Sequence, residues 1–263
     1  MKRKPVTRNT NSSDLPRRIE EASLNAWPAM RQMLYQGWIL RFSRGFTKRS
    51  NSIVPLYGPS EDNASNLLQQ IRYCENLYAR EQLPTVFRLT TLTPHETLRR
   101  LLSERGYVQA DRTLVLNQPL HSAARTPIPG ALSFQLLALE DWLGVYCQLT
   151  GMEEPTRSLH RLILNGISGD CAFAVLYQDE QPRACGMAVL EDELVGLFDV
   201  FTDPARRGSG YGLHLVNSLL AWAATNGAQR GYLQVVADNE PALRLYTGIG
   251  FEDCYEYSYY TVQ

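Results

Sequence analysis

The chain has 263 residues, of which 44% are hydrophobic and 20% are charged, which is an ordinary globular composition. This length predicts one large domain or two small ones, and no apolar run approaches the roughly 18–20 residues of a membrane-spanning helix. The basic N-terminus has no apolar stretch behind it, so we expect a solvated tail rather than a secretory signal or a nucleic-acid arm. Neither a membrane nor a nucleic acid is expected as a partner.

The cysteines and histidines argue against disulfides and metals. Five cysteines are scattered along the chain without a CxxC pair, which is typical of free thiols in a reducing cytoplasm. The four histidines lie far apart, with no HExxH and no zinc-ligand spacing. We therefore expect a cytoplasmic protein with no metal site.

The charge is divided unevenly between the two halves. Residues 1–120 hold 18 Lys and Arg against 10 Asp and Glu, whereas residues 121–263 hold 8 against 17. The last lysine is Lys48, which excludes a Walker A loop and a Schiff-base lysine from the second half. The acidic half either receives a cationic substrate or docks on the basic half, and both interpretations stay open.

In the first half, apolar patterns predict six elements. Strands are expected over 37–42, 52–57, 85–90 and 108–116, and helices over 63–80 and 94–105. A segment with two prolines and a glycine, residues 121–131, reads as a linker. The predicted organisation is a basic flexible tail (1–18), a first domain (19–120), this linker (121–131) and a second domain (132–263).

In the second half, a strand over 132–138 precedes helices near 140–150 and 155–164. Three strands then follow through short polar turns, which favours antiparallel hairpins over 171–177, 184–190 and 194–202. A helix, strand, helix and strand complete the order, over 210–226, 232–236, 240–247 and 254–262. The predicted class is α/β, with a mixed, largely antiparallel central sheet flanked by helices. Residues 86–118 and 232–263 share one order of elements, which indicates two related domains.

A glycine-rich turn links strand 194–202 to the helix that follows it. Glycines let the backbone approach a ligand closely, and the free N–H groups of the first helical turn attract negative charge. Arg206 and Arg207 add positive charge beside these N–H groups. The sequence therefore predicts that this turn binds a diphosphate. A dinucleotide fold is the weaker interpretation, because the glycine spacing is GxGxG and hairpins precede the turn instead of a βαβ unit.

A second motif runs from Asn239 to Phe251. Asn239 suits a helix N-cap and Pro241 suits the first turn. Tyr246 falls on the apolar face of this predicted helix, so a core tyrosine and a functional tyrosine are both open.

Together the two motifs resemble the GNAT acyltransferase superfamily, over roughly residues 130–263. The R-x-x-G-x-G signature stands as Arg207, Gly210 and Gly212, and the later signature stands as Asn239, Ala242, Leu245, Tyr246, Gly250 and Phe251. The resemblance implies two GNAT-like domains in tandem. It also implies that acetyl-CoA binds along Val200, Phe201 and Thr202, at Arg207, Gly208, Ser209, Gly210, Tyr211, Gly212 and Leu213, and at Asn239 and Tyr246.

The same resemblance gives Tyr246 the role of protonating the departing thiolate. The amine must lose a proton to a carboxylate, and Asp199 is our candidate base. The alternatives are carboxylates that also suit a solvated surface: Glu153, Glu154, Glu191, Asp192 and Glu193. Related acetylases of ribosomal-protein N-termini carry a glutamate on the fifth strand, where this chain has Gln234, so their base and substrate do not transfer directly.

The first half looks like a degenerate copy of the second. Glu61 and Asp62 would repel a pyrophosphate, and Leu102 stands where a tyrosine would donate a proton. We expect this half to shape the acceptor pocket or an interface. Its polar residues Arg41, Arg49 and Asn51 suit either acceptor contacts or a buried structural network.

The predicted function is an acetyl-CoA-dependent N-acetyltransferase. It would transfer an acetyl group to a primary amine, small molecule or peptide, by direct attack in a ternary complex, with the second domain alone catalytic. A CoA-ligand sensor or scaffold without turnover is the alternative, and a nucleotide-binding oxidoreductase is a third. The oligomeric state stays open, with a homodimer among the alternatives.

Overall fold

The computed structural model describes residues 14–56, 64–120 and 129–262. Glu61, Asp62, most of the predicted tail and most of the predicted linker lie outside these residues. The first half contains α1 (Leu15–Asn25), β1 (Arg31–Tyr35), β2 (Trp38–Phe42), the 3₁₀ turn η2 (Lys48–Ser50), β3 (Ile53–Pro55), α2 (Ala64–Arg80), β4 (Val86–Thr90), α3 (Glu96–Glu104) and β5 (Tyr107–Pro119). The second half contains β6 (Leu132–Leu137), α4 (Leu139–Thr150), α5 (Thr156–Asn165), β7 (Asp170–Gln178), β8 (Gln181–Glu191), β9 (Leu194–Thr202), the 3₁₀ turn η4 (Pro204–Arg206), α6 (Tyr211–Thr225), β10 (Arg230–Val236), α7 (Glu240–Gly248) and β11 (Glu252–Val262).

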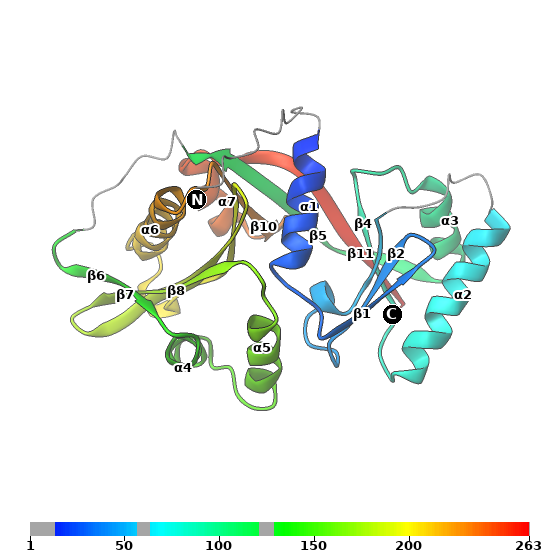
Figure 1. The fold of residues 1–263 in the computed structure, drawn as a ribbon, viewed down its shortest axis with the longest axis horizontal. Coiled ribbons are helices and arrows are strands. Elements are labelled where there is room, and N and C mark those ends of the chain that lie inside the picture. The colour runs from blue at the N-terminus through cyan, green and yellow to red at the C-terminus, as the bar shows by residue number, and fades with distance from the viewer. Residues whose placement is uncertain (1–13, 57–63, 121–128, 263) are drawn as a thin grey trace, which may run out of the picture.

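All these strands form one sheet, in the order β1-β2-β3-β4-β11-β5-β10-β9-β8-β7-β6. The pairs β3–β4 and β9–β10 are parallel, and the other neighbours are antiparallel. Helices pack on the sheet, as Figure 1 shows. The prediction of a mixed, largely antiparallel sheet flanked by helices is confirmed.

The two halves exchange strands at the centre of this sheet. The repeated unit is β4-α3-β5 in the first half and β10-α7-β11 in the second. However, β5 pairs with β10, and β11 pairs with β4, so each half lends its last described strand to the other. In Figure 1, the long strands β5 and β11 cross the middle of the molecule between the two groups of helices. The division at residues 121–131 stays a prediction, and each half builds its sheet with a strand from the other.

Three hydrophobic clusters lie against the sheet. One packs α6 on the sheet of the second half, around Leu215 and Leu219. The second combines both halves, because Ile19 and Trp27 from the N-terminal region pack with Trp142 of α4. The third lies under α2 and α3 in the first half. The second cluster therefore joins the two halves.

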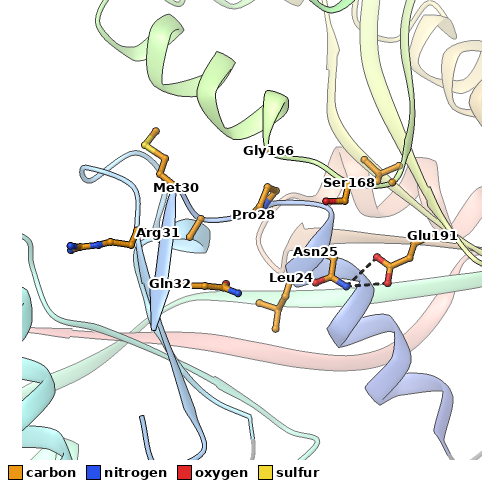
Figure 2. A pocket seen from close by; sticks show the side chains of 12 residues that line it. Leu24, Asn25, Pro28, Met30, Arg31, Gln32, Gly166, Ser168 and Glu191 are labelled. Carbon is orange, nitrogen blue, oxygen red and sulfur yellow. Dashed lines mark hydrogen bonds between the residues drawn. The ribbon is translucent and has the colours of Figure 1, made fainter. Parts of the chain in front are cut away.

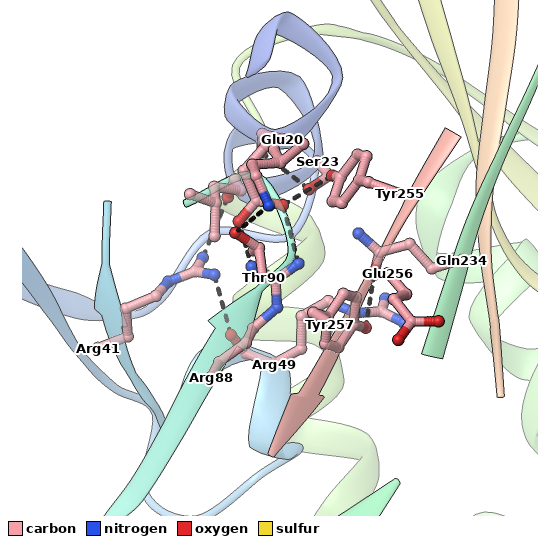
Figure 3. A network of polar contacts seen from close by, with 12 residues as sticks. Glu20, Ser23, Arg41, Arg49, Arg88, Thr90, Gln234, Tyr255, Glu256 and Tyr257 are labelled. Atoms are coloured by element: carbon pink, nitrogen blue, oxygen red, sulfur yellow. Dashed lines mark hydrogen bonds and ion pairs between the residues drawn. The ribbon is translucent and has the colours of Figure 1, made fainter. Parts of the chain in front are cut away.

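Helix α1 was not predicted, and it begins at Leu15, so residues 15–18 are helical rather than part of the tail. It is held by a buried polar network that Figure 3 shows. The Glu20 carboxylate accepts hydrogen bonds from Arg88 of β4, at 3.0 Å from Nη2, and from the Tyr255 hydroxyl of β11, at 2.7 Å. The helix is thereby fixed to strands from both halves of the chain.

Strand β1 was also not predicted, although the turn at Gln36 and Gly37 indicates a hairpin. Gln36 and Gly37 both adopt positive φ, of 46° and 83°. This conformation is typical of the two-residue hairpin turns that match strand twist. The turn places Tyr35 opposite Trp38, so 31–42 forms one hairpin.

Candidate active site

A bulge in β9 shapes the site. The parallel register of β9 with β10 ends at Leu197 and Leu233, whereas the antiparallel register with β8 continues to Thr202. The β8–β9 register shifts between Cys185 and Met187, opposite Asp199, which has a φ of 51°. A bulge bends its strand and redirects side chains. Beyond Leu197, β9 and β10 therefore separate and open the sheet.

The bulge also changes the face on which Asp199 lies. Side chains alternate along a regular strand, and Leu197 and Phe198 follow this rule by packing into different clusters. Asp199 should then lie on the face of Leu197, but its carboxylate contacts His160 of α5, on the face of Phe198. Val200 returns to the α6 face. Phe198 and Asp199 thus point to one face, while Val200 lines a cleft on the other.

This cleft has a volume of about 710 Å³ and lies between the end of β9, the glycine-rich turn, α6 and α7. It gathers the predicted cofactor residues with the exception of Ser209. It is lined by Val200, Phe201, Thr202, Arg207, Gly208, Gly210, Tyr211, Gly212, Leu213, Asn239, Pro241, Ala242, Arg244, Leu245 and Tyr246. Ser209 lies in the same turn, exposed, between two glycines that do line the cleft. Segments almost 50 residues apart in sequence meet here.

The turn before α6 has the geometry of an anion cradle. Gly208 and Gly210 adopt φ of 79° and 83°, which favours residues without a Cβ. Gly210 is the N-cap of α6, and no side chain caps the first-turn amides. Those N–H groups are unsatisfied within a helix, and the helix dipole favours an anion beside them. A Cβ on Gly212 would lie 3.2 Å from Thr202 Oγ1 and 3.4 Å from Leu245, so glycine keeps this turn close to β9.

Helix α7 forms the opposite wall. The Asn239 side chain accepts a hydrogen bond from the Ala242 amide at 3.3 Å, and a proline stands in the first turn, so the predicted cap is confirmed. Tyr246 is 8% exposed and packs edge-on against Phe251 at 5.9 Å while lining the cleft. Burial raises the pKa of Tyr246 to about 12, so its hydroxyl stays protonated at neutral pH. Tyr246 is therefore a core side chain that also lines the cleft.

A second cavity, of about 390 Å³, lies on the other side of the bulge. Both halves of the chain build it. Its walls are Trp27, Thr47, Lys48, Arg49, Asp111, Thr113, Asp199, Gln234, Val236, Tyr257 and Tyr259. Asp199 lines this cavity and its neighbour Val200 lines the cleft, so consecutive residues of β9 border the two spaces.

His160 is the residue that sequence reasoning missed. Its Nε2 lies 2.8 Å from Asp199 Oδ2, and the imidazole is almost fully buried among the rings of Trp27, Phe46, Trp142 and Tyr146. Its Nδ1 is buried without a hydrogen-bond partner among the described residues. We assign the hydrogen to Nε2, which donates to the carboxylate. No motif marks His160, because the contact joins α5 to β9 across 39 residues.

The other candidate bases lie elsewhere. Glu191 accepts hydrogen bonds from Asn25 Nδ2, at 3.0 Å and 3.2 Å, in a separate pocket of about 560 Å³ that Figure 2 shows. Glu193 pairs with Arg18 at 2.8 Å. Glu154 caps the Ser158 amide at 3.2 Å. Asp192, in the turn between β8 and β9, and Glu153 line neither the cleft nor the second cavity. Among these carboxylates, Asp199 alone borders the second cavity.

Arg41, Arg49 and Asn51 of the first half were expected to contact the acceptor or to form a buried structural network, and the structure separates them. Arg41 is fully buried and donates to the carbonyls of Leu24 and Arg49, at 3.0 Å and 2.9 Å. Asn51 is buried and bonds the backbone of residues 43–47 through both side-chain atoms. These two are structural. Arg49 instead lines the second cavity, with its guanidinium 5.0 Å above the Trp27 ring.

No helix in the described ranges is long and apolar enough to span a membrane. Among curated proteins, the chain is 28% identical over 246 residues to the uncharacterized N-acetyltransferase YobR of Bacillus subtilis, covering 92% of this chain and 97% of that protein. Two solved structures share its fold. A GCN5-related N-acetyltransferase from Kribbella flavida superposes with a TM-score of 0.73 at 15% identity, covering 97% and 96% of the two chains. A tandem GNAT protein from the clavulanic acid biosynthesis pathway superposes with a TM-score of 0.62 at 11% identity, covering 74% and 68%.

The family model described as probable histone acetyltransferase Rv0428c C-terminal matches residues 13–260, which is nearly the whole chain. The match extends through both halves, as does the similarity to the Kribbella protein. The chain therefore belongs to this acetyltransferase family, within the GNAT superfamily of acyltransferases.

Proposed function

We propose that the protein transfers an acetyl group from acetyl-CoA to a primary amine by direct attack in a ternary complex. The observation that supports this proposal is that consecutive residues of β9, Asp199 and Val200, line the second cavity and the cleft. Acetyl-CoA occupies the cleft, with its pyrophosphate at the turn before α6 and its pantetheine along Val200–Thr202. The amine enters through the second cavity. The five cysteines are free thiols, and the proposed location is the cytoplasm, where thiols stay reduced.

The reaction forms a C–N bond between the amine nitrogen and the acetyl carbonyl carbon, and it breaks the C–S bond. Before attack, the ammonium loses one proton to Asp199, directly or through water. His160 donates to one Asp199 oxygen and so orients the other towards the cavity. A backbone N–H of β9, free of β10 beyond Leu197, stabilises the oxyanion that develops on the carbonyl.

The departing thiolate takes a proton from the Tyr246 hydroxyl. A thiol has a pKa of about 8.5, well below the value of about 12 for Tyr246. The tyrosine is therefore the weaker acid, and the transfer is completed because the attacking nitrogen, strongly acidic once acylated, gives up its second proton and restores the tyrosine, directly or through water. Asp199 then releases the first proton to solvent. The position of Tyr246 argues against the sensor alternative, because binding alone requires no proton donor in the cleft.

Thermal unfolding with acetyl-CoA, CoA and NAD in parallel tests the cofactor. A ligand at about 100 times its dissociation constant adds roughly 2.7 kcal/mol to the free energy of unfolding. We expect both CoA species to raise the midpoint, and NAD to leave it unchanged. Release of free CoA in the presence of a panel of amines then tests turnover. Stabilisation by acetyl-CoA without thiol release from any amine would support the sensor, and stabilisation by NAD alone would support the oxidoreductase.

A further inference from the structure

The second cavity holds two buried hydrogen-bond donors that the protein leaves unused. Arg49 Nε and Gln234 Nε2 both lack a hydrogen-bond partner among the described residues, and both residues line the cavity. Buried donors in native proteins are almost always satisfied, by protein, water or ligand. The pair therefore leaves two donors at this point for a water molecule or a ligand that accepts hydrogen bonds.

The surroundings fix the amide orientation of Gln234. Its Oε1 accepts the Tyr257 hydroxyl at 3.0 Å, which directs Nε2 away from that contact. Figure 3 shows Arg49, Gln234 and Tyr257 coming together from the η2 turn, β10 and β11. The donors thus come from both halves of the chain.

The charges in the cavity are also incompletely paired. Lys48 binds Asp111 at 2.6 Å, which neutralises both. No carboxylate in the described ranges lies within 4.0 Å of the Arg49 guanidinium, which is held by the rings of Trp27 and Phe198, at 5.0 Å and 5.6 Å. A fixed, half-buried guanidinium without a partner suits a bidentate carboxylate. Asp199 supplies the opposite charge in the same cavity.

We propose that the acceptor is a small amine that also carries a carboxylate, as a free amino acid does. Its carboxylate lies against Arg49 and Gln234, and its amine lies at Asp199. The inference rests on the proposed function and narrows it, because polyamines and the interior amines of proteins carry no carboxylate of their own beside the reacting nitrogen. The rings of Trp27, Tyr257 and Tyr259 form an aromatic wall of the cavity, against which the remainder of the acceptor packs.

The test compares matched amines that differ only in the carboxylate. The panel holds the twenty amino acids of proteins, β-alanine, 4-aminobutyrate and their decarboxylated counterparts, such as phenethylamine for phenylalanine and cadaverine for lysine. With acetyl-CoA as donor, thiol release gives kcat and KM for each. We expect at least one amino acid to exceed its counterpart in kcat/KM by about 10- to 100-fold, with the difference mostly in KM.

Two variants assign this preference to the proposed residues. Arg49→Gln should lower kcat/KM for the amino acid about 10- to 100-fold more than for the decarboxylated amine. Gln234→Glu is nearly isosteric and replaces a donor by a carboxylate, so it should reverse the preference towards the decarboxylated amine. Arg100→Gln is the matched control, because it removes an exposed guanidinium on α3 that lines neither the cleft nor the second cavity. We expect this control to change the preference less than threefold.

The inference is overturned if acetyl-CoA stabilises the protein but only amines without a carboxylate, or no member of the panel, are acetylated. It is also overturned if the preference survives both Arg49→Gln and Gln234→Glu. Failure of acetyl-CoA to stabilise the wild-type protein would instead remove the proposed function itself. The stabilisation by acetyl-CoA, measured for every variant, shows whether the fold and the cleft remain intact.

Discussion

His160 Nε2 lies 2.8 Å from Asp199 Oδ2, and this contact joins a buried imidazole on α5 to the bulged residue of β9. The aspartate side chain is 15% exposed and the histidine side chain 1%, so the histidine supports the carboxylate from within the protein. Asp199 lines the second cavity, and the next residue of β9, Val200, lines the cleft. A carboxylate oriented in this way suits a base that receives a proton from an entering ammonium.

Asp199→Asn should lower kcat by about 10²–10⁴-fold, the usual range for loss of a general base. Asparagine tolerates the positive φ of this position, so the fold should persist. The measurement is thiol release at saturating acetyl-CoA, with thermal unfolding as the control for binding. Activity close to that of the wild type would remove Asp199 as the base.

His160→Gln tests the supporting role. Its amide can still donate to Asp199, so we expect a smaller loss than in Asp199→Asn, and a KM for acetyl-CoA close to that of the wild type. His160→Leu removes the donor and should approach the loss seen in Asp199→Asn. Equal activity of the glutamine and leucine variants would contradict a role through this hydrogen bond.

Tyr246→Phe should reduce turnover while leaving acetyl-CoA affinity nearly unchanged, because the ring keeps its packing and only the proton donor is lost. Since burial raises the pKa of Tyr246 to about 12, its hydroxyl should cause no alkaline loss of rate below about pH 11. The measurement is the pH profile of kcat for both proteins. Tyr35→Phe, which alters a tyrosine stacked on Tyr73 at 4.1 Å, is the control. An unaltered rate in Tyr246→Phe would rule out this acid.

Gly210→Glu should abolish the stabilisation by acetyl-CoA, because it places bulk and negative charge at the first turn of α6. Gly227→Glu is a matched control at the other end of that helix, since both glycines adopt positive φ, of 83° and 100°. Both variants should lose stability through backbone strain. If thermal unfolding shows the same acetyl-CoA response in both, the pyrophosphate lies elsewhere.

Glu20→Gln tests the network that fixes α1. Burial alone would raise the pKa of Glu20, but Arg88 and the hydrogen bonds outweigh it and the pKa is lowered. The carboxylate therefore stabilises the fold above its unfolded pKa of about 4.3, and this stabilisation is lost as the pH falls through the folded value. At pH 7 the variant leaves Arg88 buried without its anion, which should destabilise by about 3–5 kcal/mol.

Chemical denaturation of both proteins at several pH values measures this difference. The gap between wild type and variant should be largest near neutrality and should narrow in acid, where the wild type also loses its charge. A gap that is constant from pH 3 to pH 7 would mean that the contribution of Glu20 is not electrostatic.

Local patterns predicted most of the elements and the set of residues that line the cleft. The GNAT signatures are contiguous in sequence, and helix starts such as Asn239 follow from side-chain capping. Asp199 was named from its strand, but the bulge that turns it towards α5 depends on the β8 register and leaves no periodic signal. The second cavity was the part hardest to predict, because Trp27, Arg49 and Tyr257 meet only through the exchange of β5 and β11.

That exchange has a consequence for synthesis on the ribosome. Strand β4 obtains its β11 neighbour only after residues 252–262 have been translated, and until then one of its edges offers unpaired amides and carbonyls. Open edges of this kind pair with other chains. A nascent chain stalled or cleaved before residue 252 should therefore be prone to aggregate and to need chaperones, and the two halves should not complement each other when produced sequentially as separately folded pieces.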